Sequence, residues 1–247
     1  MIHKVFLMFF VFSLVACTKR KELEENEIVI AIIGSSTAEG NYLQNRNESW
    51  PNRLSDYLKE DADVMNFACS GYTTYHFLPQ SESGTENRPS VDSSRNIDAI
   101  LTEIPDVLII SLPTNDIANG YSKEEYLHNL KILVNHAIEY GVDDVLICTT
   151  QPRNLSVKNR EVLRSCKDDI LKTYQQNAVD FWTPLCGDNN LLQSSVDIGD
   201  GIHPNGEGHR LLFFQMKEKI DSIIEIRSVS DRFESMIVQH SNNSFLK

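Results

Sequence analysis

Three nearly uninterrupted apolar runs constrain the fold of this chain more than any other feature of its sequence. They cover residues 28–33, 107–112 and 145–149. A strand with one wet face alternates apolar and polar residues, whereas a strand buried on both faces is apolar throughout. Weaker runs at 64–68 and 178–182 bring the expected strands to about five. We therefore expect a parallel sheet whose two faces are both covered.

Stretches of helical character separate these runs and are expected to cover the two faces of the sheet. They lie at residues 49–60, 93–103, 122–140, 156–176 and from 206 to about 227. Ser122 and Glu125 stand at the spacing of a capping box, and Gly141 stands where a helix often ends. This alternation indicates an α/β fold with helices on both faces of the sheet. Ligands of such folds bind at the carboxyl ends of the strands.

The expected domain spans residues 28–227, and the segments on either side of it differ from it in composition. Lys4 precedes an apolar run of about twelve residues, too short for a membrane-spanning helix, which needs about 20. The run ends in LVAC at residues 14–17, which resembles the bacterial lipobox. We expect a lipoprotein signal over 1–16, lipidation of Cys17 and a charged tether over 17–27. The alternative is a buried helix or an uncleaved anchor.

These flanks predict an extracytoplasmic protein that contacts a membrane only through its lipid. Residues 228–247 form a tail that either docks as a short helix or frays. The formal net charge of −12 makes nucleic acid an unlikely partner, because an acidic surface repels a polyphosphate.

The cysteines of the expected mature domain leave two alternatives open. In an oxidising compartment they allow up to two disulfides, or all of them are free thiols. They show neither a CxxC pair nor a zinc spacing, so no metal site is expected. These residues are Cys69, Cys148, Cys166 and Cys186.

Polar residues follow the predicted strands at four places, and each has an ordinary structural explanation when taken alone. Ser36 lies in a serine-rich turn after the first strand, and Gly71 lies in a turn after the second. Asn115 follows the third strand, where an Asx turn is a common outcome. Asp200 and His203 share one turn before the last helix, so a carboxylate can sit beside an imidazole.

The other histidines after residue 27 have no such companion and are expected at the surface. These are His76, His128, His136, His209 and His240.

Taken in order, these motifs resemble those of the SGNH hydrolase superfamily, also called GDSL-type esterases. The resemblance covers about residues 28–225, and DGIHP at residues 200–204 is its most specific part. It implies a three-layer α/β/α sandwich with a flavodoxin-like parallel sheet. It also implies a nucleophile at Ser36 and an acid–base pair at Asp200 and His203. The implied oxyanion hole consists of Ser36, Gly71 and Asn115.

Two motifs depart from the family pattern. The usual Gly-Asp-Ser is Gly34-Ser35-Ser36 here, and the usual Gly-x-Asn-Asp begins with Pro113. Neither change removes a residue that performs the chemistry, although proline lacks an N–H and stiffens its turn. A glycan-binding lipoprotein that has lost turnover therefore remains an alternative.

The implied reaction is ester hydrolysis through an acyl-enzyme, without a metal or a cofactor. Gln151 and Arg153 follow the fourth strand and are candidate substrate contacts, although Arg153 could equally be a surface charge. The leading hypothesis is a lipid-tethered esterase that removes O-acetyl groups from polysaccharides. The substrate would then be a glycan ester or a small-molecule ester. A broad carboxylesterase, thioesterase or lysophospholipase is the alternative enzyme.

Overall fold

The computed structural model of the protein describes residues 28–244. The expected signal at 1–16, the lipidation of Cys17 and the tether up to residue 27 lie outside the described residues. Residues 245–247 at the end of the expected tail also lie outside them. The localisation inferred from the leader therefore stays a prediction.

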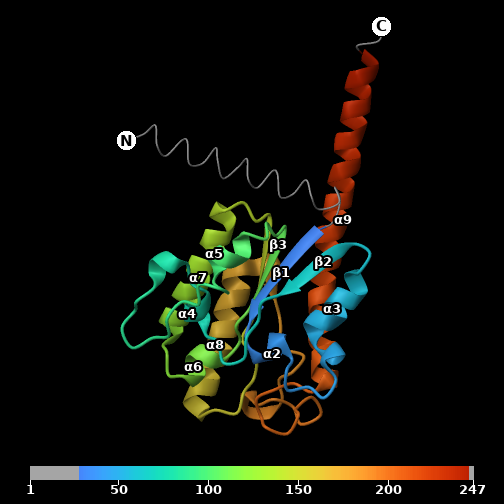
Figure 1. Cartoon of the computed structure of the whole chain (residues 1–247). Helices are drawn as coiled ribbons and strands as arrows, with labels where there is room; N and C mark the ends of the chain where they lie inside the picture. Colours follow the sequence, from blue (N-terminus) through green and yellow to red (C-terminus); the bar gives the residue numbers. More distant parts are fainter. Residues whose placement is uncertain (1–27, 245–247) are drawn as a thin grey trace, which may run out of the picture.

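Within residues 28–244, five parallel strands form one sheet in the order β2-β1-β3-β4-β5 (Figure 1). The chain moves from β1 to β2 on one side and then returns to place β3 on the other side of β1. Open α/β sheets bind their ligands where the strand order reverses in this way. The strands are β1 (Ile28–Gly34), β2 (Ala62–Asn66), β3 (Val107–Ser111), β4 (Asp144–Cys148) and β5 (Ala178–Val179).

Helices cover both faces of the sheet, which confirms the predicted α/β fold. Ser122 caps α7 as its spacing predicts, because its hydroxyl accepts the Glu125 N–H while the Glu125 carboxylate accepts the Ser122 N–H. The helices are α2 (Ser36–Glu39), α3 (Trp50–Leu58), α4 (Thr74–Phe77), α5 (Ile97–Leu101), α6 (Asn115–Ala118), α7 (Lys123–Glu139), α8 (Val157–Tyr174) and α9 (Gly206–Ser244). Short 3-10 turns occupy Arg46–Glu48, Gln80–Glu82, Gln175–Asn177 and Asp188–Asn190.

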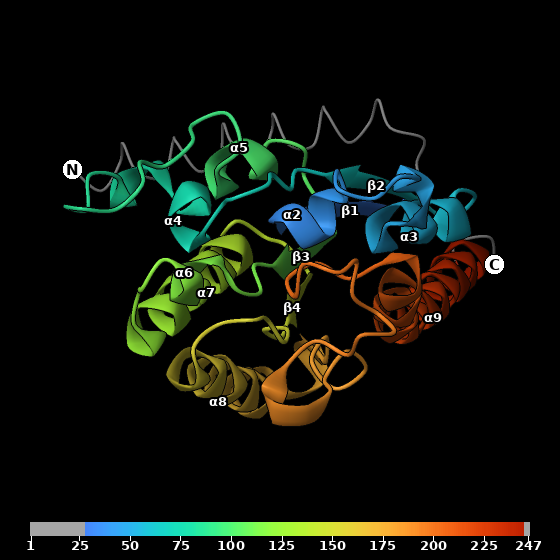
Figure 2. The same cartoon turned by 90° about the horizontal axis from the view of Figure 1, so that it is seen from below.

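The apolar strands are explained by two separate cores, one on each face of the sheet. Ile30 and Ile32 of β1 point to the face covered by α3 and α9. Ala31 and Ile33 point to the opposite face, under α5, α7 and α8. Figure 2 shows the resulting three layers from the carboxyl end of the strands. Because successive side chains alternate between faces, a strand buried on both sides needs apolar residues at every position.

The fifth strand is shorter than the sequence suggests. It was expected over 178–182, but it ends at Val179. The side chain of Asp180 explains the end, since its Oδ1 accepts the N–H groups of Trp182 (2.9 Å) and Thr183 (2.9 Å). This local Asx turn competes with the sheet for the backbone.

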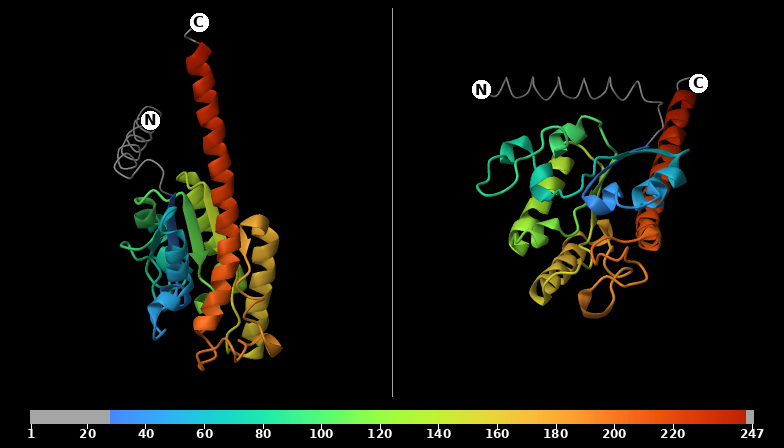
Figure 3. Two further views of the ribbon diagram at one scale, coloured as in Figure 1. Left: turned by 90° about the vertical axis from the view of Figure 1, so that its right-hand side faces the viewer. Right: turned by 60° about the horizontal axis from the view of Figure 1, so that its bottom comes forward.

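Helix α9 continues without a break past residue 227, where the domain was expected to end. Its outer part extends beyond the α/β body at the edge of the sheet where β1 begins (Figures 1 and 3). Helix α2 lies at the opposite edge (Figure 1). No helix within residues 28–244 combines the length and the apolar character that a membrane span requires.

The cysteines in the described part of the chain are all free thiols. Cys148 lies in β4 and Cys166 in α8, and both side chains are buried in the cores. Burial raises the pKa of both thiols, which keeps them protonated. They act here as small apolar residues.

Candidate active site

The polar motifs meet at the carboxyl edge of the sheet. Helix α2 follows β1, the loop around Gly71 follows β2, and α6 follows β3. The loop that contains Asp200 and His203 reaches the same edge and leads into α9. Residues that are far apart in the sequence are thus brought together at the point where the strand order reverses.

Ser36, His203 and Asp200 form one continuous chain of hydrogen bonds. Ser36 Oγ lies 2.9 Å from His203 Nε2, and His203 Nδ1 lies 2.6 Å from Asp200 Oδ2. Asp200 is ionised because the hydrogen bonds it accepts from His203 and Ile202 outweigh its burial, so that its pKa lies below the usual range. The carboxylate therefore accepts the Nδ1 proton and leaves Nε2 free to accept the hydroxyl proton of Ser36.

The backbone places Ser36 at the first position of α2. The turn before it requires Gly34, because a Cβ there would lie 2.6 Å from the Cβ of Ala38 and 2.9 Å from the carbonyl oxygen of Ser111. The first N–H groups of a helix have no partner within the helix. The N–H of Ser36 is therefore available beside its own hydroxyl.

Gly71 and Asn115 present two further donors from the ends of β2 and β3. Gly71 has φ +82°, and its N–H makes no hydrogen bond to any residue that the structure describes. Asn115 donates one Nδ2 hydrogen to the carbonyl oxygen of Tyr72 at 2.9 Å, which leaves the second hydrogen for a ligand. Donors of this kind can stabilise the oxyanion of a tetrahedral intermediate.

Comparison with known proteins decides the family. The profile of the GDSL-like lipase/acylhydrolase family matches residues 32–211. The chain belongs to this family. It is therefore a GDSL hydrolase of the SGNH type, an enzyme that cleaves carboxylic esters. An arylesterase from Vibrio mimicus is 22% identical to it over 181 residues, which cover 72% of this chain and 80% of the relative.

Solved structures share the fold of this GDSL hydrolase at low sequence identity. A psychrotrophic esterase from Pseudoalteromonas sp. superposes with a TM-score of 0.61 at 20% identity, covering 81% of this chain and 100% of the other. A Bacteroides fragilis protein for which acylhydrolase activity is proposed superposes with a TM-score of 0.62 at 22% identity. The match covers 84% of this chain and 94% of the other. A two-domain esterase active on acetylated mannans reaches 0.54 at 18% identity, covering 85% and 55%.

Arg153 of the GDSL hydrolase turns toward the oxyanion donors. Its Nη1 donates to Asn115 Oδ1 at 2.9 Å and to Thr114 Oγ1 at 3.0 Å. Burial lowers the pKa of the guanidinium and the charge of Asp200 opposes this, so Arg153 remains a cation. The contact fixes which side of the Asn115 amide faces the substrate. Arg153 is still partly exposed, so a contact with substrate stays a prediction.

Gln151 does not occupy the position that the sequence suggested. Its side chain is only 1% exposed, so it does not line a surface that a substrate reaches. Its Nε2 donates to Thr37 Oγ1 at 3.0 Å and to the carbonyl oxygen of Ile202 at 3.3 Å. Gln151 therefore ties the helix that carries Ser36 to the loop that carries His203.

His209 was expected at the surface, and this expectation is wrong. Its side chain is 0% exposed, its Nδ1 accepts the N–H of Trp50 at 3.1 Å, and its Nε2 lies 2.7 Å from the hydroxyl of Tyr42. His209 heads a row of buried residues at helical spacing in α9, with Leu212 and Met216. That spacing is the signal that could have placed His209 in the core. His136 also has a partner, Asp98, at 2.7 Å.

Two carboxylates that the sequence analysis missed hold the segments that carry Gly71 and Asn115. Glu39 of α2 accepts the N–H of Ser70 at 2.7 Å, next to Gly71. Asp116, beside Asn115, accepts the N–H of Thr74 at 3.2 Å. Burial raises the pKa of Asp116 to about 6, against the hydrogen bonds from Thr74. These contacts link the segments that follow β1, β2 and β3.

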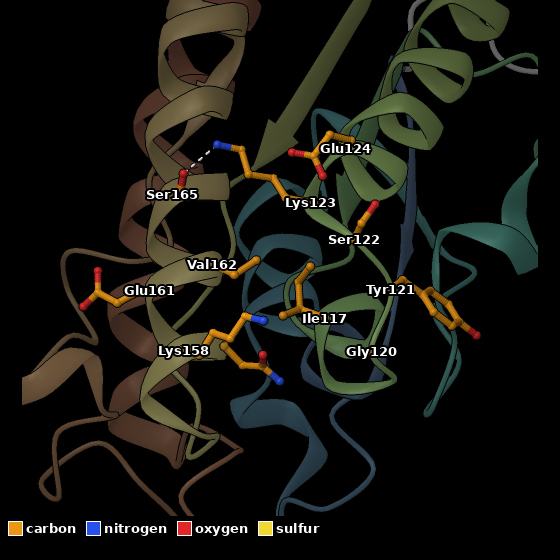
Figure 4. Close-up of a pocket in the computed structure, with 11 residues that line it drawn as sticks. Ile117, Gly120, Tyr121, Ser122, Lys123, Glu124, Lys158, Glu161, Val162 and Ser165 are labelled. Atoms are coloured by element: carbon orange, nitrogen blue, oxygen red, sulfur yellow. Dashed lines mark hydrogen bonds between the residues drawn. The ribbon is translucent and has the colours of Figure 1, made fainter.

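A cleft of about 630 Å³ opens between the turn that joins α6 to α7 and the first half of α8 (Figure 4). Its lining includes none of Ser36, Asp200 and His203. Lys123 spans it, with Nζ 2.6 Å from Ser165 Oγ and 2.6 Å from Asp169 Oδ2. The cleft is thus separate from the triad, and Lys123 braces its two walls. Among the side chains that the structure describes, those of residues 28–229, no His, Cys, Asp and Glu residues cluster as a metal site would require.

Proposed function

We propose that this GDSL hydrolase removes short acyl groups, O-acetyl groups above all, from carbohydrate. The observation that carries the ester cleavage in this proposal is the unbroken hydrogen-bonded chain from Ser36 through His203 to Asp200. The proposal assigns Ser36 as the nucleophile, His203 as the general base and Asp200 as the group that orients His203.

The first half of the reaction forms an acetyl-enzyme. Ser36 Oγ attacks the ester carbonyl while its proton moves to His203 Nε2, and Asp200 stabilises the imidazolium. The new oxyanion accepts hydrogen bonds from the N–H groups of Ser36 and Gly71 and from Asn115 Nδ2. When the carbonyl re-forms, the sugar oxygen leaves with the proton of His203.

The second half returns the enzyme to its starting state. Water enters the position that the sugar left and attacks the acetyl carbonyl, and His203 takes the proton of the water. The same donors hold the second tetrahedral oxyanion. Collapse releases acetic acid, which ionises to acetate in water, and the proton on His203 returns to Ser36 Oγ.

Two features favour a carbohydrate ester over a lipid. The rim of the site is polar, with the exposed side chains of Ser70 and Asn154 and the partly exposed Arg153. Asn154 lies against the catalytic loop, since its N–H donates to the carbonyl oxygen of Gly201 at 2.7 Å. A structural neighbour is an esterase active on acetylated mannans, which makes acetylated glycans a sensible first substrate.

We also propose that the enzyme is anchored outside the cytoplasm through a lipid on Cys17. The described chain enters the fold at Ile28, at the edge of the sheet opposite α2 (Figure 1). An anchor attached before residue 28 would therefore join the fold at the end of the sheet remote from the catalytic residues. This attachment leaves the catalytic residues accessible to a polymer in the surrounding space.

The test compares the hydrolysis of nitrophenyl acetate, butyrate and octanoate by the full-length protein. Ser36→Ala supplies the blank, and Ser35→Ala is the matched control because Ser35 is a buried neighbour outside the triad. We expect acetate to be preferred and Ser36→Ala alone to be inactive. Release of acetate from acetylated mannan then tests the glycan. A preference for octanoate would contradict the short-chain proposal and favour lipid or thioester substrates.

A further inference from the structure

Tyr42 lies against the face of the His203 imidazole. The centroids of the two rings are 4.2 Å apart, and their planes are inclined by 36°. The hydrogen bonds to Ser36 and Asp200 hold the imidazole only at its two nitrogen atoms. A ring held at two points in its own plane can still tilt about the line between them. Tyr42 occupies the space into which His203 would tilt.

Tyr42 is itself held by His209, a histidine that the reaction does not use. The Trp50 N–H donates to His209 Nδ1 at 3.1 Å, so this nitrogen carries no hydrogen. A neutral imidazole then carries its hydrogen on Nε2, which donates to the Tyr42 hydroxyl oxygen at 2.7 Å. The backbone of α3 thus fixes the tautomer of His209, and His209 fixes the position of Tyr42.

Neither His209 nor Tyr42 changes its charge in the pH range in which an esterase works. Burial lowers the pKa of His209 to about 3, with smaller contributions in the same direction from Arg53 and His203. Burial likewise raises the pKa of Tyr42 above its ordinary value. Both groups therefore stay neutral, and the pair acts as a fixed support rather than as a proton relay.

A second contact joins this support to the nucleophile. The hydroxyl of Thr37 lies near that of Tyr42 and opposes the effect of burial on the pKa of Tyr42. Thr37 follows Ser36 in α2 and accepts a hydrogen bond from Gln151 Nε2 at 3.0 Å. The Tyr42 side chain therefore lies between α2, which carries the nucleophile, and α9, which carries His209.

We propose that Tyr42, aimed by His209, is a positioning residue for the catalytic histidine. Its ring keeps the His203 imidazole aligned between Asp200 and Ser36. Its π face also attracts the imidazolium that forms as Ser36 attacks, as aromatic faces attract cations. The inference rests on the proposed function, in which His203 is the general base.

The test replaces the ring and its support separately in the full-length protein. Tyr42→Leu removes the ring, and Tyr42→Phe keeps it without the hydroxyl. His209→Phe removes the donor to Tyr42 without touching that residue. Tyr57→Leu is the matched control, since Tyr57 is an exposed tyrosine of α3. Thermal unfolding of each variant shows that the measured protein is folded.

We expect Tyr42→Leu to lower kcat on nitrophenyl acetate by about tenfold to thirtyfold, with KM changed by no more than about threefold. Tyr42→Phe and His209→Phe both keep the ring but remove the hydrogen bond between the two side chains, so each should lower kcat by about twofold to fivefold, less than Tyr42→Leu does. Tyr57→Leu should match the wild type. A loss confined to KM would place Tyr42 in substrate binding and overturn the inference.

A proton NMR resonance distinguishes a loss of His203 alignment from a general loss of stability. The proton shared by His203 Nδ1 and Asp200 gives a downfield proton NMR resonance when its exchange with water is slow. We expect this resonance to broaden or vanish in Tyr42→Leu and to broaden less in Tyr42→Phe and His209→Phe, which keep the ring but lose the hydrogen bond that holds it. If kcat and the resonance of folded Tyr42→Leu equal those of the wild type while Ser36→Ala is inactive, Tyr42 is not a positioning residue. If Ser36→Ala stays active, the proposed function itself fails.

Discussion

Replacing Arg153 by methionine tests how the oxyanion donors are organised. Methionine keeps much of the length and the apolar stem of arginine but removes its charge and its donors. In the wild type, Arg153 Nη1 is 2.9 Å from Asn115 Oδ1 and 3.0 Å from Thr114 Oγ1. Without these contacts the Asn115 amide loses the partner that orients its oxygen, so its Nδ2 no longer points reliably at the substrate.

The expected loss follows from the energy of that contact. A hydrogen bond to a charged group contributes about 1.5–3 kcal/mol, and about 1.4 kcal/mol corresponds to a factor of ten in rate. We therefore predict that Arg153→Met lowers kcat by about tenfold to a hundredfold. The upper limit is the loss of the Asn115 donor itself, which is expected to cost about 10²–10³ in kcat.

The assay is steady-state hydrolysis of nitrophenyl acetate by the single and double variants. Arg164→Met, which removes an exposed arginine of α8, controls for the change in net charge. Because Arg153 is argued to act through Asn115, Arg153→Met should cost less than about threefold in an Asn115→Ala background. Equal losses in both backgrounds would refute this reasoning. A raised KM with unchanged kcat would instead support direct substrate contact by Arg153.

Three further predictions follow from the same geometry. Asn115→Ala should lower kcat by about 10²–10³ with an unchanged melting temperature, and a loss within about twofold would remove Asn115 from the oxyanion hole. Gly34→Ala should reduce the free energy of urea unfolding by about 1–3 kcal/mol, because its Cβ would lie 2.6 Å from that of Ala38. Since burial raises the pKa of Asp116 to about 6, the folded state binds that proton more tightly than the unfolded state does. The wild type should therefore lose on the order of 2 kcal/mol relative to Asp116→Asn between about pH 4 and pH 7, and parallel pH curves in urea unfolding would contradict this.

The fold was predictable because buried parallel strands leave a strong signal in the sequence. The runs at β1, β3 and β4 are apolar at nearly every position, and Gly34 at the end of β1 marks a close turn. The end of β5 was not predictable in the same way. It depends on one Asp180 side chain that accepts two backbone N–H groups, and such local competition is invisible in the apolar pattern.

The positions of Ser36, Asp200 and His203 were predictable because Ser36 comes just after β1 and the other two share the turn before α9, but their supporting residues were not. Tyr42 reaches the site from a segment without a motif, and the role of Glu39 in α2 depends on a contact with Ser70, far along the chain. Gln151 followed the expected strand but turned into the protein, because Thr37 and the carbonyl oxygen of Ile202 offer it partners there. Which way a side chain turns after a strand is decided by tertiary contacts.

Covalent labelling of Ser36 tests the central claim most directly. A fluorophosphonate reacts with an activated serine by forming an Oγ–P bond and releasing fluoride, and intact-protein mass spectrometry counts the adducts. We predict one adduct on the wild type and on Ser35→Ala, located at Ser36 by peptide mapping, and none on Ser36→Ala. Hydrolysis of nitrophenyl acetate should disappear together with the label. Unchanged labelling and hydrolysis in folded Ser36→Ala would contradict the assignment of Ser36 as the nucleophile.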